Sequence, residues 1–350
     1  MAEPTTTTSG TIPSEAYVKD ILATIERERE REIVARRFGL FDRKETLEQI
    51  GELLGITRER VRQLEKSVVT RLKTTAEQGG LPHLDDVQAK LVEHLSGAGQ
   101  VARISDVTAV FGGDNDRLEQ SRLAFLALLC PELVVVDDDD NFYYSVAVKK
   151  VFSEKSLKEA VAKLVDTIKK MGEPKEIDDI AKAAGFEDDK QAEALASTSK
   201  NLATLNGRWG LVKWPMVNPK NIRDKIYVIL KEQGKHMHFN EIAAAIKDSE
   251  FKRKDVTTQA IHNELIKDSR FVLIGRGIYA LKEWGYKKGT VADIISEVLR
   301  EAGEPLHRDE IVKRVLKSRF VKETTILLNL QGKPQFKRVA KATYTLADAE

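Results

Sequence analysis

Cysteine, aromatic residues and long apolar runs are all scarce in this sequence of 350 residues. Its one cysteine, Cys130, excludes an internal disulfide and fits a reducing cytoplasmic compartment; its apolar neighbours indicate a core residue. No apolar run approaches the roughly 20 residues of a membrane-spanning helix, so we expect no membrane partner. Residues 1–14 open with a threonine-rich stretch that lacks the parts of a signal peptide, and we expect a disordered leader there.

The common sequence signatures of catalysis are also missing. We find no Walker loop, no nucleophile elbow and no convincing pair of carboxylates. His236, His238 and His307 lie near expected helix starts, but no cysteines or carboxylates accompany them at metal-ligand spacing. We therefore expect neither an enzyme nor a bound metal or cofactor.

Charge is plentiful but nearly balanced, with 57 basic against 55 acidic side chains. Its distribution is more informative than its net value of +2. Residues 81–152 carry 6 basic and 12 acidic side chains, whereas residues 218–290 carry 15 and 9. The segment from Arg58 to Lys73 holds six basic side chains against two acidic ones. These differences indicate segments with different partners.

A pattern of glycines, apolar residues and capping residues occurs four times along the chain. Each glycine follows the apolar face of an expected helix and should end that helix. Six residues later comes a residue suited to cap the next helix, followed by an acidic residue that suits the helix dipole. The glycines are Gly99, Gly172, Gly234 and Gly303, and the expected N-caps are Ser105, Asp178, Asn240 and Asp309.

Each of these units ends with a third expected helix and two β-rich runs. Asn206-Gly207 and Gly275-Arg276-Gly277 are turn signals between such runs. Three helices and a β-hairpin are the layout of a winged helix. We therefore predict a mainly α-helical protein with small β-hairpins, comprising a helix-turn-helix domain and four tandem winged-helix domains. The expected boundaries are 15–80 for the helix-turn-helix, then 81–152, 153–217, 218–290 and 291–350 for the winged helices.

The helix-turn-helix is predicted from three helices, Glu26–Arg37, Leu47–Leu54 and Arg58–Lys73. Thr46 and Gln49 fit a capping box at the start of the second helix. Gly55 allows the left-handed backbone of a tight turn, and Thr57 can cap the third helix.

One face of the third helix has the side chains of a base-reading surface. Arginine can donate two bonds to guanine, glutamine can pair with adenine, and glutamate can accept from cytosine. Charged helix faces are also commonly solvated and ion-paired, and the pattern alone leaves both interpretations open. The residues of this face are Arg58, Glu59, Arg62, Gln63 and Lys66.

Residues 36–40, 45–51 and 57–65 closely resemble the C-terminal domain, region four, of housekeeping sigma factors. The resemblance covers roughly residues 20–75. It implies a domain that reads the minus-thirty-five promoter element in double-stranded DNA and docks on the β flap of RNA polymerase. It assigns base contacts to Arg58, Glu59 and Gln63, with Arg62 on the same face. Nothing in the chain resembles the sigma domain that grips the polymerase clamp and melts the minus-ten element, so a complete sigma factor of that class is excluded.

The repeats have a resemblance of their own. Residues 208–214 are similar to the wing of the RNA polymerase delta subunit, and residues 277–286 resemble the wider HARE-HTH family of winged helices. That family implies binding of DNA or of protein partners. Arg276 at its wing tip could contact phosphate or enter a minor groove, or it could be an exposed turn residue. Asp137 to Asp140 would repel phosphate, which favours a protein partner, or a solvated turn, for the first winged helix.

Three functions remain open from the sequence. The first is a cytoplasmic, nucleoid-associated transcription regulator that binds promoter DNA and contacts RNA polymerase. The second is a polymerase-bound interaction protein without base readout. The third is a nucleoid or DNA-defence protein that binds DNA broadly.

Overall fold

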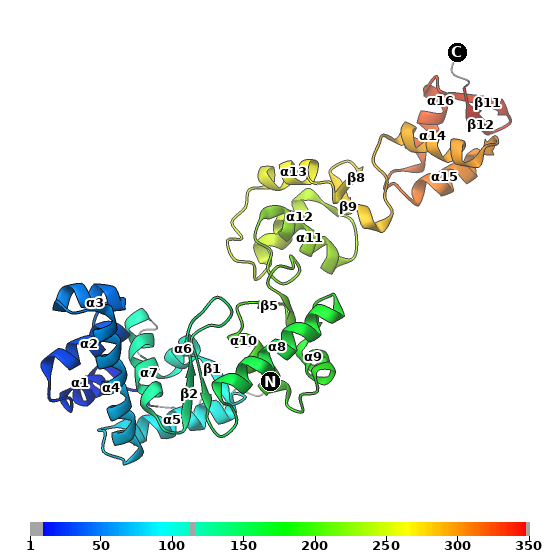
Figure 1. The fold of residues 1–350 in the computed structure, drawn as a ribbon. Helices are drawn as coiled ribbons and strands as arrows, with labels where there is room; N and C mark the ends of the chain where they lie inside the picture. Colours follow the sequence, from blue (N-terminus) through cyan, green and yellow to red (C-terminus); the bar gives the residue numbers. More distant parts are fainter. Residues whose placement is uncertain (1–9, 113–115, 348–350) are drawn as a thin grey trace. The chain divides into compact units, whose positions relative to one another are not determined.

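Helices dominate the computed structural model, which describes residues 10–112 and 116–347 (Figure 1). Four small antiparallel sheets lie among them, each with three strands. This architecture confirms the predicted fold class. The chain divides into two compact units, Met1–Val212 and Lys213–Glu350, which are described separately below. No helix in the described ranges is both long and apolar enough to cross a membrane.

The N-terminal unit begins with four helices. They are α1 (Ser14–Ala23), α2 (Glu28–Phe38), α3 (Leu47–Leu54) and α4 (Arg58–Glu77). The last three confirm the predicted helices, whereas α1 was not predicted. Residues 1–9 of the expected leader lie outside the described residues. From Ile12 onward the chain is packed, because Ile12 is buried and its N–H donates to the carbonyl of Phe111. The predicted leader is therefore too long at its C-terminal end.

Each of the four repeats has the same element order of helix, strand, two helices and two strands. The first contains α5 (Leu84–Gly97), β1 (Val101–Arg103), α6 (Ile104–Phe111), α7 (Arg117–Leu129), β2 (Leu133–Val136) and β3 (Ser145–Val148). The second contains α8 (Glu154–Met171), β4 (Lys175–Glu176), α9 (Ile177–Ala184), α10 (Asp189–Thr198), β5 (Leu202–Leu205) and β6 (Arg208–Leu211).

The C-terminal unit holds the other two repeats. The third contains α11 (Ile222–Gln233), β7 (Met237–His238), α12 (Phe239–Asp248), α13 (Thr258–Lys267), β8 (Phe271–Gly275) and β9 (Ile278–Leu281), followed by the 3-10 turn η1 (Lys282–Trp284). The fourth contains α14 (Val291–Ala302), β10 (Leu306–His307), α15 (Arg308–Leu316), α16 (Glu323–Gly332), β11 (Phe336–Ala340) and β12 (Thr343–Leu346).

Every sheet adds one short strand to the predicted hairpin. The order is the same in all four, β1-β3-β2 in the first repeat, so the short strand pairs with the last strand of its repeat. Pairs such as Lys175 with Trp209 and Met237 with Tyr279 join these strands. A strand of two or three residues is too short to show the alternation that predicts strands. The sequence prediction therefore missed it.

The helix ends agree only in part with the capping prediction. Gly172, Gly234 and Gly303 follow their helices in the left-handed conformation, as predicted, whereas α5 ends two residues before Gly99. The predicted N-caps are wrong by two residues because each helix begins directly after the short strand. The N-caps are Arg103, Glu176, His238 and His307.

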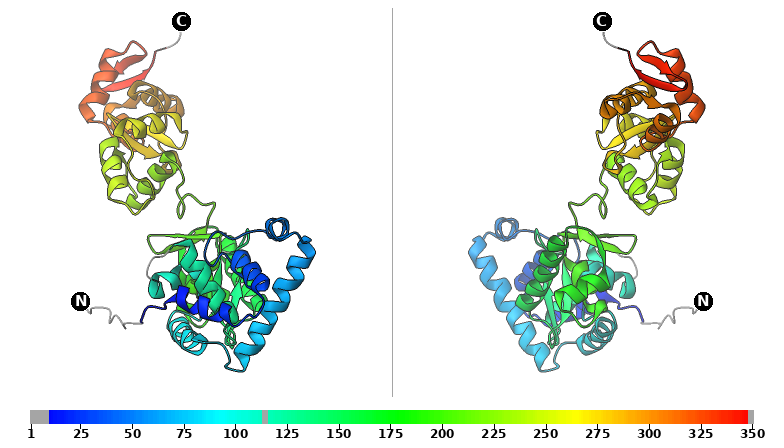
Figure 2. Two further views of the ribbon diagram at one scale, coloured as in Figure 1. Left: turned by 90° about the vertical axis from the view of Figure 1, so that its left-hand side faces the viewer. Right: turned by 90° about the vertical axis from the view of Figure 1, so that its right-hand side faces the viewer.

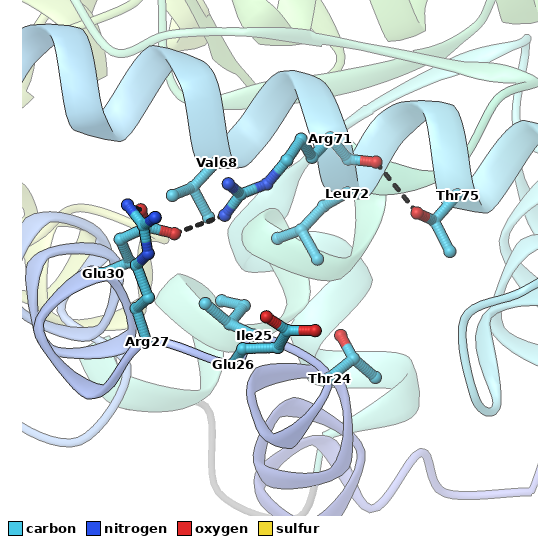
Figure 3. A pocket seen from close by; sticks show the side chains of 9 residues that line it. All are labelled: Thr24, Ile25, Glu26, Arg27, Glu30, Val68, Arg71, Leu72 and Thr75. Atoms are coloured by element: carbon cyan, nitrogen blue, oxygen red, sulfur yellow. Dashed lines mark hydrogen bonds and ion pairs between the residues drawn. The ribbon is translucent and has the colours of Figure 1, made fainter.

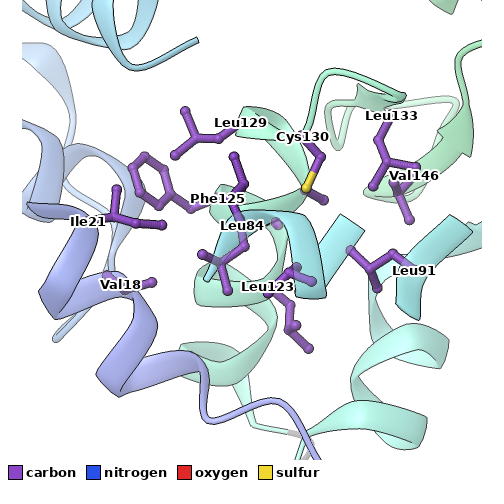
Figure 4. Close-up of a cluster of buried hydrophobic side chains, with 14 of the residues drawn as sticks. Val18, Ile21, Leu84, Leu91, Leu123, Phe125, Leu129, Cys130, Leu133 and Val146 are labelled. Atoms are coloured by element: carbon purple, nitrogen blue, oxygen red, sulfur yellow. The ribbon is translucent and has the colours of Figure 1, made fainter. Parts of the chain in front are cut away.

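One hydrophobic core joins α1, α2 and α4 to the first winged helix (Figure 4). Val18 and Ile21 of α1 lie beside Phe125 and Leu129 of α7, and Leu72 of α4 belongs to the same buried cluster. All are less than 5% exposed. Cys130 is buried in this core as predicted, and burial raises the pKa of its thiol to about 12. The predicted boundary at residue 80 thus falls between elements that share a core.

Arg122 on α7 adds polar contacts to this junction. Its side chain is buried and donates to the carbonyl of Leu40 at 2.9 Å. It also pairs with Glu15 of α1 and with Glu119 of its own helix, both at 3.0 Å. A buried guanidinium is tolerated where its donors have such partners.

The second winged helix packs directly on the first. Gly99 lies so close to α10 that a Cβ there would be 2.6 Å from the carbonyl oxygen of Lys190. The acidic segment 137–140 also meets the second winged helix, because Lys200 pairs with Asp138 at 2.9 Å and donates to the carbonyl of Asp139. Two of the four aspartates expected to repel phosphate, Asp138 and Asp139, thus bind the second winged helix.

Within the C-terminal unit, the fourth repeat contacts the strand β8 of the third. The N–H of Phe320 donates to the carbonyl of Ile274 at 3.0 Å, and Arg319 donates to the carbonyl of Leu273. Arg319 is buried at this contact.

We expect limited trypsin digestion of the full chain to cut first between residues 213 and 223. Lys213, Lys220 and Arg223 are exposed there, in or next to a segment without regular structure. The shared core should protect the bonds near Gly79 and Gly80. Mass spectrometry of the early fragments tests this; early release of a fragment that ends near residue 80 would contradict a shared core.

Arg122→Ala should destabilise the N-terminal unit by about 2–4 kcal/mol, because it removes the donor to the buried carbonyl of Leu40 and to the largely buried Glu119. Arg117→Ala, on the same helix but exposed, is the matched control and should change stability by less than about 0.5 kcal/mol. Urea unfolding followed by circular dichroism measures both. Equal stabilities of the two variants would show that Arg122 does not hold the junction.

Candidate nucleic-acid interface

The turn between α3 and α4 is built from local capping contacts. Thr46 and Gln49 form the predicted capping box at the start of α3, with bonds of 3.2 and 2.9 Å. Gly55 has a φ of 64°, in the left-handed region that favours glycine. Thr57 then caps α4 by accepting the N–H of Arg60. These contacts fix where α4 begins.

A small apolar cluster holds α3 and α4 together against α2. Ile33, Ile50 and Val61 are fully buried at its centre. Gly51 allows the close approach, since a Cβ there would lie 2.7 Å from the carbonyl oxygen of Ile56. Such a short distance excludes larger side chains at this position unless the turn shifts.

Helix α4 is long, and its two sides differ sharply. Figure 2 shows it as the long light-blue helix at the margin of the N-terminal unit. Val61, Val68, Leu72 and Ala76 are buried on one side. The structure brings all five of the α4 residues predicted from sequence together on the exposed part of its first three turns, namely Arg58, Glu59, Arg62, Gln63 and Lys66.

Three of these side chains form a hydrogen-bonded group. Arg62 binds both carboxylate oxygens of Glu59, at 2.7 and 2.8 Å, and the Gln63 amide donates to the same carboxylate at 3.4 Å. The bonds from Arg62 lower the pKa of Glu59 below its usual value, and Glu59 in turn raises the pKa of Arg62. The face is therefore partly ion-paired, which the sequence analysis had offered as the alternative to base reading.

Arg58 and Lys66 differ from this group. Neither side chain has an ion pair or hydrogen bond within the described ranges, and both are exposed. They flank the Glu59 group and leave two cationic side chains available to an external partner.

Sequence reasoning missed Arg60, which also belongs to this region. Its side chain is exposed and donates to the Gln63 amide oxygen at 3.3 Å. The spacing of three residues was a usable signal, because positions three apart are neighbours on a helix.

A cleft of about 360 Å³ lies against the middle of α4 (Figure 3). The carboxylate of Glu30 is buried there and pairs with Arg71 of α4, and with Arg27 at 3.4 Å. These bonds link the start of α2 to α4 behind the exposed face. The cleft has both charged and apolar walls. Its charged side chains Arg27, Glu30 and Arg71 form ion pairs with one another.

Arg276 belongs to the C-terminal unit, apart in sequence from the α4 residues. Its side chain is exposed at the turn between β8 and β9. Gly277 beside it has a φ of 70° and packs on His238 and Phe239. His238 and His307, considered as metal ligands, act instead as N-caps of α12 and α15. Among the described residues no group of three His, Cys, Asp or Glu side chains is placed to hold a metal ion.

Comparison with known proteins assigns the helix-turn-helix to a family. Residues 27–74 match the family described as sigma-70, region 4. This range contains α2, α3 and nearly all of α4, so the N-terminal helix-turn-helix matches this family, as the sequence resemblance indicated. The resemblance of the repeats to HARE-HTH domains stays a prediction.

Individual relatives match this chain over segments of similar length. The chain is 50% identical over 46 residues to RNA polymerase sigma factor sigB of Arabidopsis thaliana, which covers 13% of this chain and 8% of that protein. It is 44% identical over 57 residues to RNA polymerase sigma factor SigA of a Bacillus species, covering 16% and 15%. It is 43% identical over 61 residues to RNA polymerase sigma factor RpoD of Helicobacter pylori, covering 17% and 9%. The chain thus spans less than a sixth of the length of these relatives.

Gly51→Ala should destabilise the helix-turn-helix by about 1–3 kcal/mol, because the added methyl meets backbone that cannot move freely. Alanine is otherwise the better helix former, so an open site should gain stability. Gly97→Ala is the control, since a Cβ there meets nothing within 4 Å. Thermal unfolding of the full chain compares them; a Gly51 variant as stable as the Gly97 variant would contradict the close packing.

Proposed function

We propose that this protein is a sequence-specific DNA-binding transcription regulator or RNA polymerase accessory factor, and that α4 reads promoter-like duplex DNA. The observation that carries the proposal is the exposed face of α4 at the start of the second helix of a sigma-70 region 4 domain. In a helix-turn-helix, the N-terminal residues of the second helix reach base edges in the major groove.

The chemistry of the face supports two kinds of contact. Arg58, for which the described residues offer no ion pair, lies at the N-terminal end of α4 and suits a guanine edge, whereas the Gln63 amide suits adenine. Lys66 lies two turns along the helix and suits a phosphate. The pairing of Arg62 with Glu59 holds both side chains in a defined geometry before any ligand binds. Pre-ordered side chains lose less conformational entropy on binding.

The packing of the domain supports a rigid presentation of this face. The apolar sides of α1, α2 and α4 are covered by α7 of the same chain, through the core shared with the first winged helix. The exposed part of α4 lies on the other side of the helix. Binding should therefore be studied with the full chain, because residues 15–80 alone would expose the surface that α7 covers.

Arg58→Ala and Gln63→Ala should each weaken binding to the preferred duplex by about 1–3 kcal/mol and relax specificity at one base pair. Lys66→Ala should weaken binding to all duplexes and reduce the salt dependence by about one phosphate contact. Fluorescence anisotropy with the preferred and a shuffled duplex measures both effects.

Lys169→Ala is the matched control, since Lys169 is exposed on α8 and outside the helix-turn-helix. It should bind as the unmodified chain does. If Arg58→Ala, Gln63→Ala and their combination all leave affinity and sequence preference unchanged, α4 does not read DNA. The second candidate, a polymerase-bound protein without base readout, would then be favoured.

A further inference from the structure

The connection between α12 and α13 presents three consecutive basic side chains. Lys252, Arg253 and Lys254, which we call the basic turn, are all exposed. No ion pair is found for any of them in the described part of the chain, although Lys254 donates to the carbonyl of Ser249 at 3.1 Å. Asp255 follows directly, so these four residues carry a net charge of +2.

A buried lysine of α11 binds the backbone of the basic turn. Lys225 of α11 is 4% exposed, and its ammonium donates to the carbonyls of Lys252 at 2.7 Å and Arg253 at 2.6 Å. Burial lowers the pKa of Lys225. Arg253 has a φ of 54°, a left-handed backbone that a residue other than glycine adopts rarely. A buried ammonium is costly unless it is hydrogen-bonded, and the carbonyls of Lys252 and Arg253 supply its acceptors. These bonds fix the shape of the basic turn.

Polar side chains continue this surface along α13. Gln259 and Asn263 are exposed one turn apart, and the Gln259 amide donates to the Asn263 oxygen at 3.1 Å. The ring of His262 on α13 lies 5.0 Å from the ring of Phe239. A Cβ on Gly277 would lie 3.0 Å from the Phe239 ring. The wing tip that carries Arg276 therefore reaches the same side of the repeat as α13.

Parts of the equivalent surfaces of the other repeats are used for packing. Helix α7 lies in the core shared with the helix-turn-helix, and α10 packs against Gly99. The connection before α16 is held on β8 through Arg319. The third repeat thus keeps both its turn and its third helix exposed, within the residues that the structure describes.

We infer that the basic turn, α13 and the Arg276 wing form a second duplex-DNA-binding surface, which binds through phosphates and independently of sequence. Three cationic side chains on a fixed turn match the repeating charge of a DNA backbone. The inference adds a second contact to the proposed function and does not require that α4 reads bases.

The test is the salt dependence of binding by the full chain to a duplex of arbitrary sequence. A variant with Lys252→Gln, Arg253→Gln and Lys254→Gln should bind about tenfold more weakly and lower the slope of log affinity against log salt by about 2–3. The control carries the same charge change on exposed lysines of the second repeat, Lys169→Gln, Lys170→Gln and Lys182→Gln. It should retain nearly the full slope. Equal losses in both variants, or no loss in the first, would overturn the inference.

Lys225→Met tests the anchoring of the turn separately from its charge. It keeps the three exposed cations and should still weaken binding, because the turn loses its fixed shape. Unchanged affinity in a variant that melts like the parent would show that Lys225 does not position the turn. Should the variant fail to fold, the surface substitutions decide the inference.

Failure of this surface and failure of α4 give different results. Loss of sequence preference in Arg58→Ala and Gln63→Ala, with an unchanged salt slope, shows that α4 reads bases. A reduced slope with unchanged sequence preference in the variant with Lys252→Gln, Arg253→Gln and Lys254→Gln shows that the basic turn binds DNA. Combining both sets of substitutions should give both losses together.

Discussion

The packing of α7 against the helix-turn-helix is the contact on which the N-terminal unit depends. Leucines and Phe125 on α7 are buried between α1, α4 and α5, and Arg122 satisfies backbone and carboxylate acceptors at the edge of that core. A helix-turn-helix of some 60 residues is a marginal fold by itself. Here it gains its stability by sharing a core with the next domain. Because that core covers one side of α4, it also determines which side remains for a ligand.

The same principle extends along the chain. The second winged helix packs on the first through Gly99, and the fourth packs on the third through Arg319 and Phe320. Surfaces that an isolated winged helix would leave to a partner are thus used internally. The acidic segment of the first repeat illustrates this, since Lys200 binds it. In the third repeat the fourth packs on β8, whereas the basic turn and α13 stay exposed within the described residues. This repeat is also the most basic.

Periodicity and capping residues were sufficient to predict the helix-turn-helix. Leu47–Leu54 was predicted at its observed bounds, because Thr46 and Gly55 mark both ends, and Arg58, Glu59, Arg62, Gln63 and Lys66 do share one exposed face. Contacts between distant segments could not be predicted. Nothing near Arg122 in sequence indicates Leu40, and nothing near Lys225 indicates the turn 27 residues later. The short strands were not predicted because two or three residues are too few to show an alternating pattern. The N-caps were predicted two residues too late for the same reason, since each helix begins directly after its short strand.

We propose above all that the exposed face of α4 reads DNA sequence. Selection of binding sites by the purified full chain, from a random duplex library and without RNA polymerase, tests this most directly. We expect enrichment of one short motif, with guanine and adenine positions that match Arg58 and Gln63. Retention of duplexes without any enriched motif would contradict it, and would leave a protein that binds DNA only through its charge.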